Sequence, residues 1–305
     1  MLALDKNRSH FLARFRGLIQ AGAALLTNIH LPNFLKGTLY QGKGKYLCVP
    51  GLNCYSCPGA AGACPIGAFQ AVVGSSKFRF SYYVTGILIL LGVLLGRFIC
   101  GFLCPFGWLQ ELLHKIPSPK RSTKRLKPLR YLKYAVLLIM VVLLPAFVVN
   151  EMGMGDPFFC KYLCPQGVLE GAIPLSLTNA GIRAALGKLF SWKFCILLAV
   201  VVASVVFYRP FCKWLCPLGA FYALFNRVSL FQMKVDKNKC VSCGKCARAC
   251  KMDVDVTKTP NHTECIRCGM CIRACPTNAV CFRYGFGDGK EKENAATLRE
   301  NNNKA

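Results

Sequence analysis

Four apolar stretches divide the N-terminal two thirds of the chain, and polar or cationic connections separate them. They run from Leu18 to Leu35, Tyr82 to Gly96, Tyr134 to Val149 and Phe194 to Tyr208. Each approaches the ~20 residues that a helix needs to cross a hydrocarbon core about 30 Å thick. The first is the weakest, because Gln20, Asn28 and His30 interrupt it. A run this short could also be a buried core helix, but four of them with cationic loops between them favour membrane spans.

The composition supports a membrane protein. The 305 residues are 54% hydrophobic and 17% charged, with a mean hydropathy of +0.37, which is more apolar than is usual for a soluble protein of this length. The formal net charge is +26, but many of the cations crowd the connection between the second and third apolar stretches. They are Lys115, Lys120, Arg121, Lys124, Arg125, Lys127, Arg130 and Lys133.

Cations that flank membrane spans mark the cytoplasmic side. We therefore place this connection in the cytoplasm, together with the N-terminal segment that carries Lys6, Arg8, Arg14 and Arg16. Four spans then put the C-terminus on the same side. The sequence thus predicts a multi-pass protein of the cytoplasmic (inner) membrane with both termini in the cytoplasm. Its expected partner is membrane lipid and not nucleic acid.

Two cysteine runs near the C-terminus have the spacing of bacterial ferredoxins, in which the fourth cysteine of each run binds the other cluster. They are Cys240-x2-Cys243-x2-Cys246-x3-Cys250 and Cys265-x2-Cys268-x2-Cys271-x3-Cys275-Pro276. A crossed pattern gives one [4Fe-4S] cluster on Cys240, Cys243, Cys246 and Cys275. The second [4Fe-4S] cluster then has the ligands Cys265, Cys268, Cys271 and Cys250. A zinc site is the alternative, but zinc uses four ligands in two pairs, whereas each run here supplies four cysteines at one fixed spacing.

The tetrapeptide Cys-Pro-x-Gly recurs four times, at residues 64–67, 104–107, 164–167 and 216–219. In the last three copies another cysteine lies four residues earlier, and the second and fourth copies each follow an apolar stretch. This pattern indicates a two-helix unit that is used twice. Proline is favoured at the first position of a helix, so each motif cysteine should lie at a helix N-cap. The free N–H groups there stabilise a thiolate or an anionic cluster.

Two further sites follow if the repeat units face each other. The inner set, expected at the inner membrane face, comprises Cys100, Cys104, Cys212 and Cys216. The outer set, expected at the outer face, comprises Cys48, Cys54, Cys57, Cys64, Cys160 and Cys164. Each set has enough thiolates for a further [4Fe-4S] cluster. Alternatives remain, because the inner set could bind a copper ion or act as a redox dithiol, and the outer set could form disulfides.

These patterns predict an all-α membrane domain over residues 1–230, with four transmembrane helices and a two-fold internal repeat. A small α+β ferredoxin domain with two [4Fe-4S] clusters follows over residues 231–285. Residues 286–305 are predicted to be a disordered tail from their polar, charged composition. The chain has no nucleophile elbow, phosphate loop or dinucleotide fingerprint, so we expect no catalytic residues for substrate chemistry.

The Cys-x3-Cys-Pro motifs after the second and fourth apolar stretches, combined with the ferredoxin runs, resemble those of the membrane-bound polyferredoxins of the NapH, NosR and CcoG types. The resemblance covers roughly residues 80–280. It implies electron transfer between a quinol or cytoplasmic donor and an extracytoplasmic acceptor, with redox partner proteins on one or both sides. The alternative functions are a copper reductase that uses the inner set and a thiol oxidoreductase that uses Cys160 and Cys164.

Overall fold

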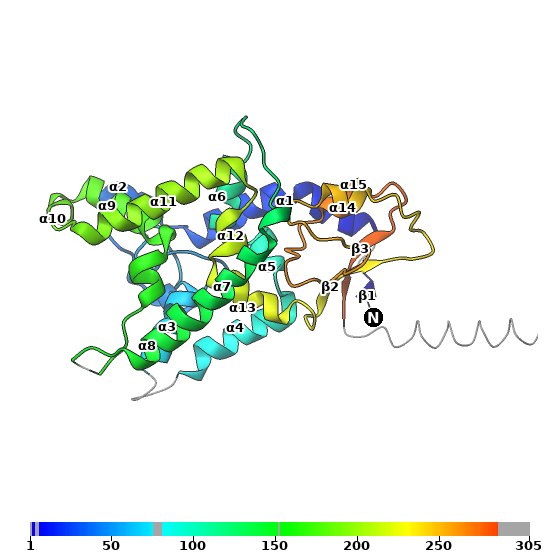
Figure 1. Cartoon of the computed structure of the whole chain (residues 1–305). Helices are drawn as coiled ribbons and strands as arrows, with labels where there is room; N and C mark the ends of the chain where they lie inside the picture. Colours follow the sequence, from blue (N-terminus) through cyan, green and yellow to red (C-terminus); the bar gives the residue numbers. More distant parts are fainter. Residues whose placement is uncertain (1, 4–5, 76–80, 152, 286–305) are drawn as a thin grey trace, which may run out of the picture.

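A computed structural model describes residues 2–3, 6–75, 81–151 and 153–285, so the predicted tail at 286–305 lies outside the described residues. In Figure 1 a body of helices occupies one side of the molecule, and the small sheet with α14 (Lys245–Ala249) and α15 (Met270–Ala274) occupies the other.

Most helices are short. The α-helices of the body are α1 (Lys6–Thr27), α2 (Pro32–Lys36), α3 (Pro65–Gly74), α4 (Tyr82–Leu95), α5 (Phe98–Phe102), α6 (Pro105–Leu113), α7 (Leu132–Val136), α8 (Leu144–Phe147), α9 (Ile173–Thr178), α10 (Ala180–Ala184), α11 (Lys188–Val206), α12 (Pro210–Trp214) and α13 (Pro217–Phe225). The 3₁₀ and π segments are η1 (Lys43–Tyr46), η2 (Lys124–Tyr131), η3 (Leu137–Leu143), η4 (Phe159–Leu163) and η5 (Gly167–Ala172). The strands are β1 (Leu2–Ala3), β2 (Phe231–Val235) and β3 (Val280–Tyr284).

Two helices in the described part of the chain are long and apolar enough to cross a membrane. One is the continuous run Lys124–Phe147, and the other is α11. Large apolar side chains on both are exposed in the protein, among them Leu138, Phe147, Leu198 and Val202. Exposed apolar faces of this kind fit contact with lipid, so the two helices indicate membrane association.

The other two predicted spans differ from the sequence-based expectation. The stretch Leu18 to Leu35 is not one helix, because α1 ends at Thr27 and α2 begins at Pro32. Proline has no N–H and cannot continue the hydrogen bonding of a preceding helix. The second stretch forms α4, which has 14 residues. A helix of this length is about 21 Å long, shorter than a hydrocarbon core of about 30 Å.

The N-terminus belongs to the ferredoxin end of the structure. The sheet has the order β1-β3-β2, and both pairings are antiparallel. The Phe282 N–H also donates to Ser9 Oγ at 3.2 Å, which ties α1 to β3. Residues 2–3, which fall within the predicted first domain, therefore pair with a strand of the ferredoxin domain.

The helical body and the ferredoxin end meet at a close backbone contact. Gly101, in α5, lies against the carbonyl of Ile266, a residue between two ferredoxin cysteines. Ile266 itself is 1% exposed. No side chain fits between these two backbones, so the contact requires glycine.

We predict that Gly101→Ala separates the two parts, because its methyl group would overlap the Ile266 carbonyl oxygen. Overpacking of this kind costs about 1–3 kcal/mol. The melting temperature of the purified protein in detergent should fall, and limited proteolysis should release the ferredoxin end. Gly86→Ala in α4 is the matched control, since nothing lies within 4 Å of its new methyl group. Equal behaviour of the two variants would contradict the prediction.

Candidate functional site

The ferredoxin cysteines line two cavities. Cys250, Cys265, Cys268 and Cys271 line one of them, and Cys240, Cys243, Cys246 and Cys275 line the other. Each cavity thus holds three cysteines of one run and the fourth cysteine of the other, which is the grouping that the spacing predicts. The remaining lining of the first cavity is largely apolar, as an enclosed iron–sulfur cube requires.

The two runs share one backbone conformation. Ser242 and Arg267, each placed before the second cysteine of its run, have φ of 51° and 52°. Gly244 and Gly269, each placed after that cysteine, have φ of 69° and 76°. These left-handed residues are costly outside glycine and persist only where the surroundings impose them. Here they curl each run around its cavity.

The inner set converges within the helical body. Cys104 and Cys216 are the N-caps of α6 and α13, while Cys100 and Cys212 lie in α5 and α12. Burial, and then the charges of Cys212 and Cys100, raise the pKa of Cys104 to about 12. Burial and the other three thiols likewise raise the pKa of Cys216. Four buried thiols that repel one another as thiolates fit a site where metal ions supply the opposite charge.

The motif glycine contributes its N–H to the cysteine sulfur in each copy. Gly219 N donates to Cys216 Sγ at 3.4 Å. The same interaction joins the other three motif cysteines to the N–H groups of Gly67, Gly107 and Gly167. Three of the motif cysteines are N-caps of the helix that follows, as the proline predicts. The helix N-termini therefore point at the sulfurs.

Two fully buried arginines cross between the halves of the inner set. Arg97 Nη2 donates to the Cys212 carbonyl at 3.4 Å, and Arg209 Nη1 donates to the Cys100 carbonyl. Both side chains are 0% exposed. Arg209 stands over Gly107, and Arg97 stands over Gly219, so the motif glycine leaves room for a guanidinium. Positive charge placed there offsets an anionic cluster.

Four of the six outer cysteines come together. Cys164 interacts electrostatically with Cys160, Cys54 and Cys64, and burial adds to these charges in raising its pKa. A methyl group at Gly67 would lie 3.8 Å from Cys160 Sγ, and one at Gly167 would lie 3.8 Å from Cys54 Sγ. Cys54, Cys64, Cys160 and Cys164 therefore form a second tetrad, which we call the outer tetrad.

The remaining two outer cysteines lie beside this tetrad. Cys57 Sγ donates to Asn28 Oδ1 at 3.4 Å, and burial together with the charges of Glu170 and Cys54 raises its pKa. Cys48 interacts with Cys64 alone among the described cysteines. The twenty cysteines form no disulfide in the described residues. The same residues contain no group of three or more His, Cys, Asp or Glu side chains placed around a single metal ion.

Two lysines take the place of the arginines at the outer tetrad. Lys193 Nζ donates to the Cys160 carbonyl at 3.0 Å and lies over Gly167. Lys45 Nζ, 7% exposed as a residue, donates to the Tyr55 carbonyl at 2.6 Å beside Cys54. In each of the four cysteine segments of the helical body, a cation thus contacts the carbonyl of a tetrad cysteine or the carbonyl of the residue that follows one.

Sequence reasoning missed a set of side chains six residues after each motif cysteine. Gln70 Nε2 donates to Cys160 Sγ at 3.2 Å, and Gln110 Nε2 donates to Cys212 Sγ at the same distance. Glu170 and Tyr222 occupy this position in the other two copies. Amide donors to a ligand sulfur tune an iron–sulfur centre. Aligning the four motif copies over a longer window would have revealed a polar residue at this position in each.

Tyr222 lies between the inner set and the outer tetrad. It is 0% exposed, and its hydroxyl donates to the Pro50 carbonyl at 3.1 Å. Burial and charges from both sides, Cys100 and Cys104 on one and Cys64 on the other, raise its pKa. The two tetrads are therefore neighbours and share one apolar core.

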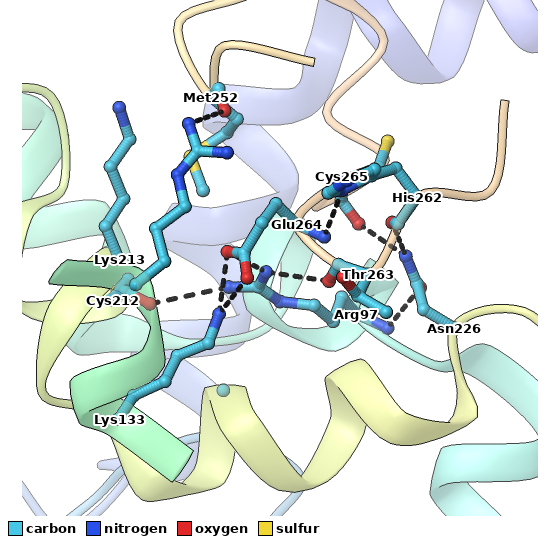
Figure 2. A network of polar contacts seen from close by, with 12 residues as sticks. Arg97, Lys133, Cys212, Lys213, Asn226, Met252, His262, Thr263, Glu264 and Cys265 are labelled. Carbon is cyan, nitrogen blue, oxygen red and sulfur yellow. Dashed lines mark hydrogen bonds and ion pairs between the residues drawn. The ribbon is translucent and has the colours of Figure 1, made fainter. Parts of the chain in front are cut away.

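A buried ionic network joins the inner set to the ferredoxin cysteines. Figure 2 shows the carboxylate of Glu264 between Arg97 and Lys133, at 2.9 and 2.6 Å. Asn226 Nδ2 adds two hydrogen bonds between the helical body and the ferredoxin end, to the carbonyls of His262 and Cys265 at 2.6 and 3.0 Å. One guanidinium thus contacts both a Cys212 carbonyl and the residue before Cys265.

The charge of Glu264 is fixed by this network. Burial opposes its ionisation, but the cations of Arg97 and Lys133 outweigh burial and lower the pKa of its carboxyl to about 2. A depressed pKa means that the ionised carboxylate stabilises the folded protein above the ordinary pKa of glutamate. This contribution is lost only as the pH falls toward 2.

Family models match the cysteine framework from Cys64 to Cys275, but the matched residues begin after Cys48, Cys54 and Cys57. The family model described as 4Fe-4S binding domain matches residues 62–83, 80–124, 133–173 and 189–238. The model described as 4Fe-4S dicluster domain matches residues 232–276. No solved structure matches the chain.

Curated relatives match over much of the chain. The uncharacterized protein MJ0750 of Methanocaldococcus jannaschii is 31% identical over 66% of this chain and 77% of its own length. The putative electron transport protein YccM of Escherichia coli is 25% identical over 56% of this chain and 45% of its own length. The regulatory protein NosR of Pseudomonas aeruginosa is 27% identical over 50% of this chain, which spans 20% of NosR. The resemblance to membrane polyferredoxins is thereby confirmed.

We predict that Glu264→Gln strongly destabilises the protein, because it leaves Arg97 and Lys133 buried without a counter-charge. Breaking a buried pair by removing one partner costs about 3–5 kcal/mol. Asp156→Asn is the matched control, since the ion pair between Asp156 and Lys161 is exposed and should contribute little. Melting temperatures of both variants in detergent check this. If the Glu264→Gln variant were as stable as the Asp156→Asn variant, the network would not be what holds the helical body and the ferredoxin end together.

Proposed function

The chain belongs to the 4Fe-4S binding domain family, and we propose that it conducts electrons through four [4Fe-4S] clusters in a row. The proposed ligands of the two ferredoxin clusters are the crossed sets Cys240, Cys243, Cys246, Cys275 and Cys265, Cys268, Cys271, Cys250. The inner set Cys100, Cys104, Cys212 and Cys216 would hold the third cluster. The outer tetrad Cys54, Cys64, Cys160 and Cys164 would hold the fourth. Cys48 and Cys57 are left out of this assignment.

The observation that carries the proposal is the contact between neighbouring sites. Tyr222 touches the surroundings of both membrane-domain tetrads. The Gly101 backbone, next to Cys100, lies against Ile266, which precedes Cys268 by two residues. The two ferredoxin sites exchange their fourth cysteines. Neighbouring sites are therefore separated by a single residue or by a single contact between backbones. This short separation gives electrons a continuous path.

The surrounding charges suit this role. A cluster held by four thiolates is anionic, and adding an electron makes it more so. The cations Arg97, Arg209, Lys45 and Lys193 favour the reduced form, and thiolate-directed N–H groups act in the same direction. In the absence of such groups a reduced cluster would be unstable in an apolar core.

We place the cytoplasmic donor at the ferredoxin end. Cys243 is exposed, and Val241, which follows Cys240, is 64% exposed, so a partner protein could approach this cluster closely. The opposite end of the row, at the outer tetrad, is then the exit toward an extracytoplasmic acceptor. This arrangement keeps the proposed topology of four membrane segments with both termini in the cytoplasm. YccM is named as an electron transport protein, which supports the same role here.

The two other functions have less support. A thiol oxidoreductase needs an accessible cysteine pair, yet Cys164 is 7% exposed and gathered with three other cysteines. A copper reductase needs a path for the ion, and the inner set is 6–7% exposed. Both sets are better suited to a resident cluster.

We predict that the purified protein contains about sixteen iron atoms and about sixteen acid-labile sulfides, as four [4Fe-4S] cubes require. Cys216→Ser and Cys164→Ser should each lose about one quarter of the iron, with loss of one cluster signal in electron paramagnetic resonance. Cys57→Ser and Cys195→Ser are controls that should keep the full content. An iron count that stops at about eight would refute the four-cluster row.

A quinol is the alternative donor, and a cavity of about 210 Å³ between α1, α6 and η5 supports it. Phe106, Leu109 and Leu169 give it apolar walls, and Pro105 places it next to Cys104. Gln166 Oε1, buried and without a hydrogen-bond partner among the described residues, could accept an O–H from a quinol. A ring there would lie between the inner set and the outer tetrad.

A variant that fills this cavity tests whether a quinol binds there. Ala24 lines it from α1, so Ala24→Leu should slow cluster reduction by a short-tailed quinol at least about tenfold, through lost binding. Reduction by dithionite should not change. Ala23→Leu, which adds the same bulk one position earlier, is the control. If both variants accept electrons from quinol as fast as the unmodified protein, the cavity is not the quinol site.

A further inference from the structure

A cationic cavity lies beside the ferredoxin end, apart from the cysteine tetrads of the helical body. Its volume is about 340 Å³, and its walls come from the connection before Lys124–Phe147, from residues after α11, and from α14 and the segment that follows it. Six basic side chains line it: Lys120, Arg121, Lys124, Lys213, Arg248 and Lys251. Asp253 is the one acidic residue among the described residues of the lining.

This acid is already neutralised. Lys213 Nζ and Arg130 Nη2 each lie 3.2 Å from Asp253 Oδ2. The side chains of Arg121 and Lys124 are exposed and make no ion pair or hydrogen bond with any described residue. Lys251 Nζ lies 5.3 Å from the centre of the Tyr208 ring and has no acidic partner in the described residues. Positive charge therefore exceeds negative charge among the described side chains that line the cavity, which also include Cys250, a proposed ligand of one ferredoxin cluster.

The cavity lies where both candidate membrane helices end. Lys120 Nζ donates to the Val205 carbonyl at 2.8 Å, and Arg121 N donates to the Val206 carbonyl at 3.3 Å. These carbonyls belong to the last residues of α11. Lys124 is the first residue of the other candidate span. Two helices that span a bilayer end at its surface, so the cavity lies at the level of lipid headgroups.

We propose that this cavity binds the phosphate headgroup of an anionic phospholipid. Phosphate oxygens accept charge-assisted hydrogen bonds from Lys and Arg. Basic pockets between membrane helices bind such headgroups, and each nearby cation contributes about 1 kcal/mol. An anionic lipid is favoured over a zwitterionic one because the cavity cations repel a headgroup ammonium. Its acyl chains, which free phosphate lacks, would lie against the exposed apolar side chains of the spans.

The test uses the purified full-length protein in a neutral detergent. Dihexanoyl phosphatidylglycerol, dihexanoyl phosphatidylcholine and inorganic phosphate are added separately, and the melting temperature is followed as each is titrated. A ligand that binds the folded state raises the melting temperature with its concentration. We expect a saturable rise with phosphatidylglycerol alone. An equal rise with phosphatidylcholine, an equal rise with inorganic phosphate, or no rise at all would overturn the proposal.

Two double variants decide where the lipid binds. Arg121→Ala with Lys124→Ala removes two cations from the cavity and should weaken the apparent affinity for phosphatidylglycerol about fivefold for each cation. Arg125→Ala with Lys127→Ala removes the same charge from exposed positions of the same connection that do not line the cavity. This pair should bind as the unmodified protein does. Equal weakening in both pairs would indicate general attraction to the basic surface and would refute a built site. The measurement does not depend on electron transfer, so it is independent of the proposed conduit.

Discussion

The burial of anionic cysteine sites in an apolar core is the constraint on which the rest of this structure depends. Thiolates and the cubes they hold are costly away from water unless positive charge lies nearby. The helical body meets this cost with one cation for each cysteine segment. Arg97 and Arg209 serve the inner set, and Lys45 and Lys193 serve the outer tetrad. The glycine of Cys-Pro-x-Gly leaves room for three of these cations, Arg97, Arg209 and Lys193.

The buried cations in turn require acids, and the positions of the acids explain how the two parts are joined. Arg209 pairs with Glu111 at 2.8 Å inside the helical body. Arg97 instead pairs with Glu264, which belongs to the ferredoxin end. The same guanidinium therefore contacts the inner set and holds the segment that carries Cys265, the next site in the proposed row, beside it. One ion pair thus both compensates the buried charge and aligns the two sites.

The sequence predicted the features that depend on local spacing and missed those that depend on packing. The grouping of the ferredoxin cysteines around two cavities follows from their spacing, and the N-cap position of three of the four motif cysteines follows from proline. Only two of the four expected spans are long enough in the described residues, because apolar length does not reveal where a helix breaks. Nor could spacing choose Cys54 over Cys48 and Cys57, since that choice depends on how the loop folds against η5.

The position six residues after each motif cysteine shows how one repeated unit serves different surroundings. In two copies a glutamine donates to a cysteine of the facing segment. In the third, Glu170 accepts from the Cys54 N–H at 3.0 Å. It thereby holds the loop in which Cys54 takes the place of the cysteine that the first copy lacks four residues before its motif. In the fourth, Tyr222 fills the space between the two tetrads. A repeat that served two separate sites would have no reason to differ there. The Tyr222 ring lies in the apolar core that both tetrads share, and the Pro50 carbonyl accepts from its hydroxyl, so the polar atom of this buried side chain has a partner.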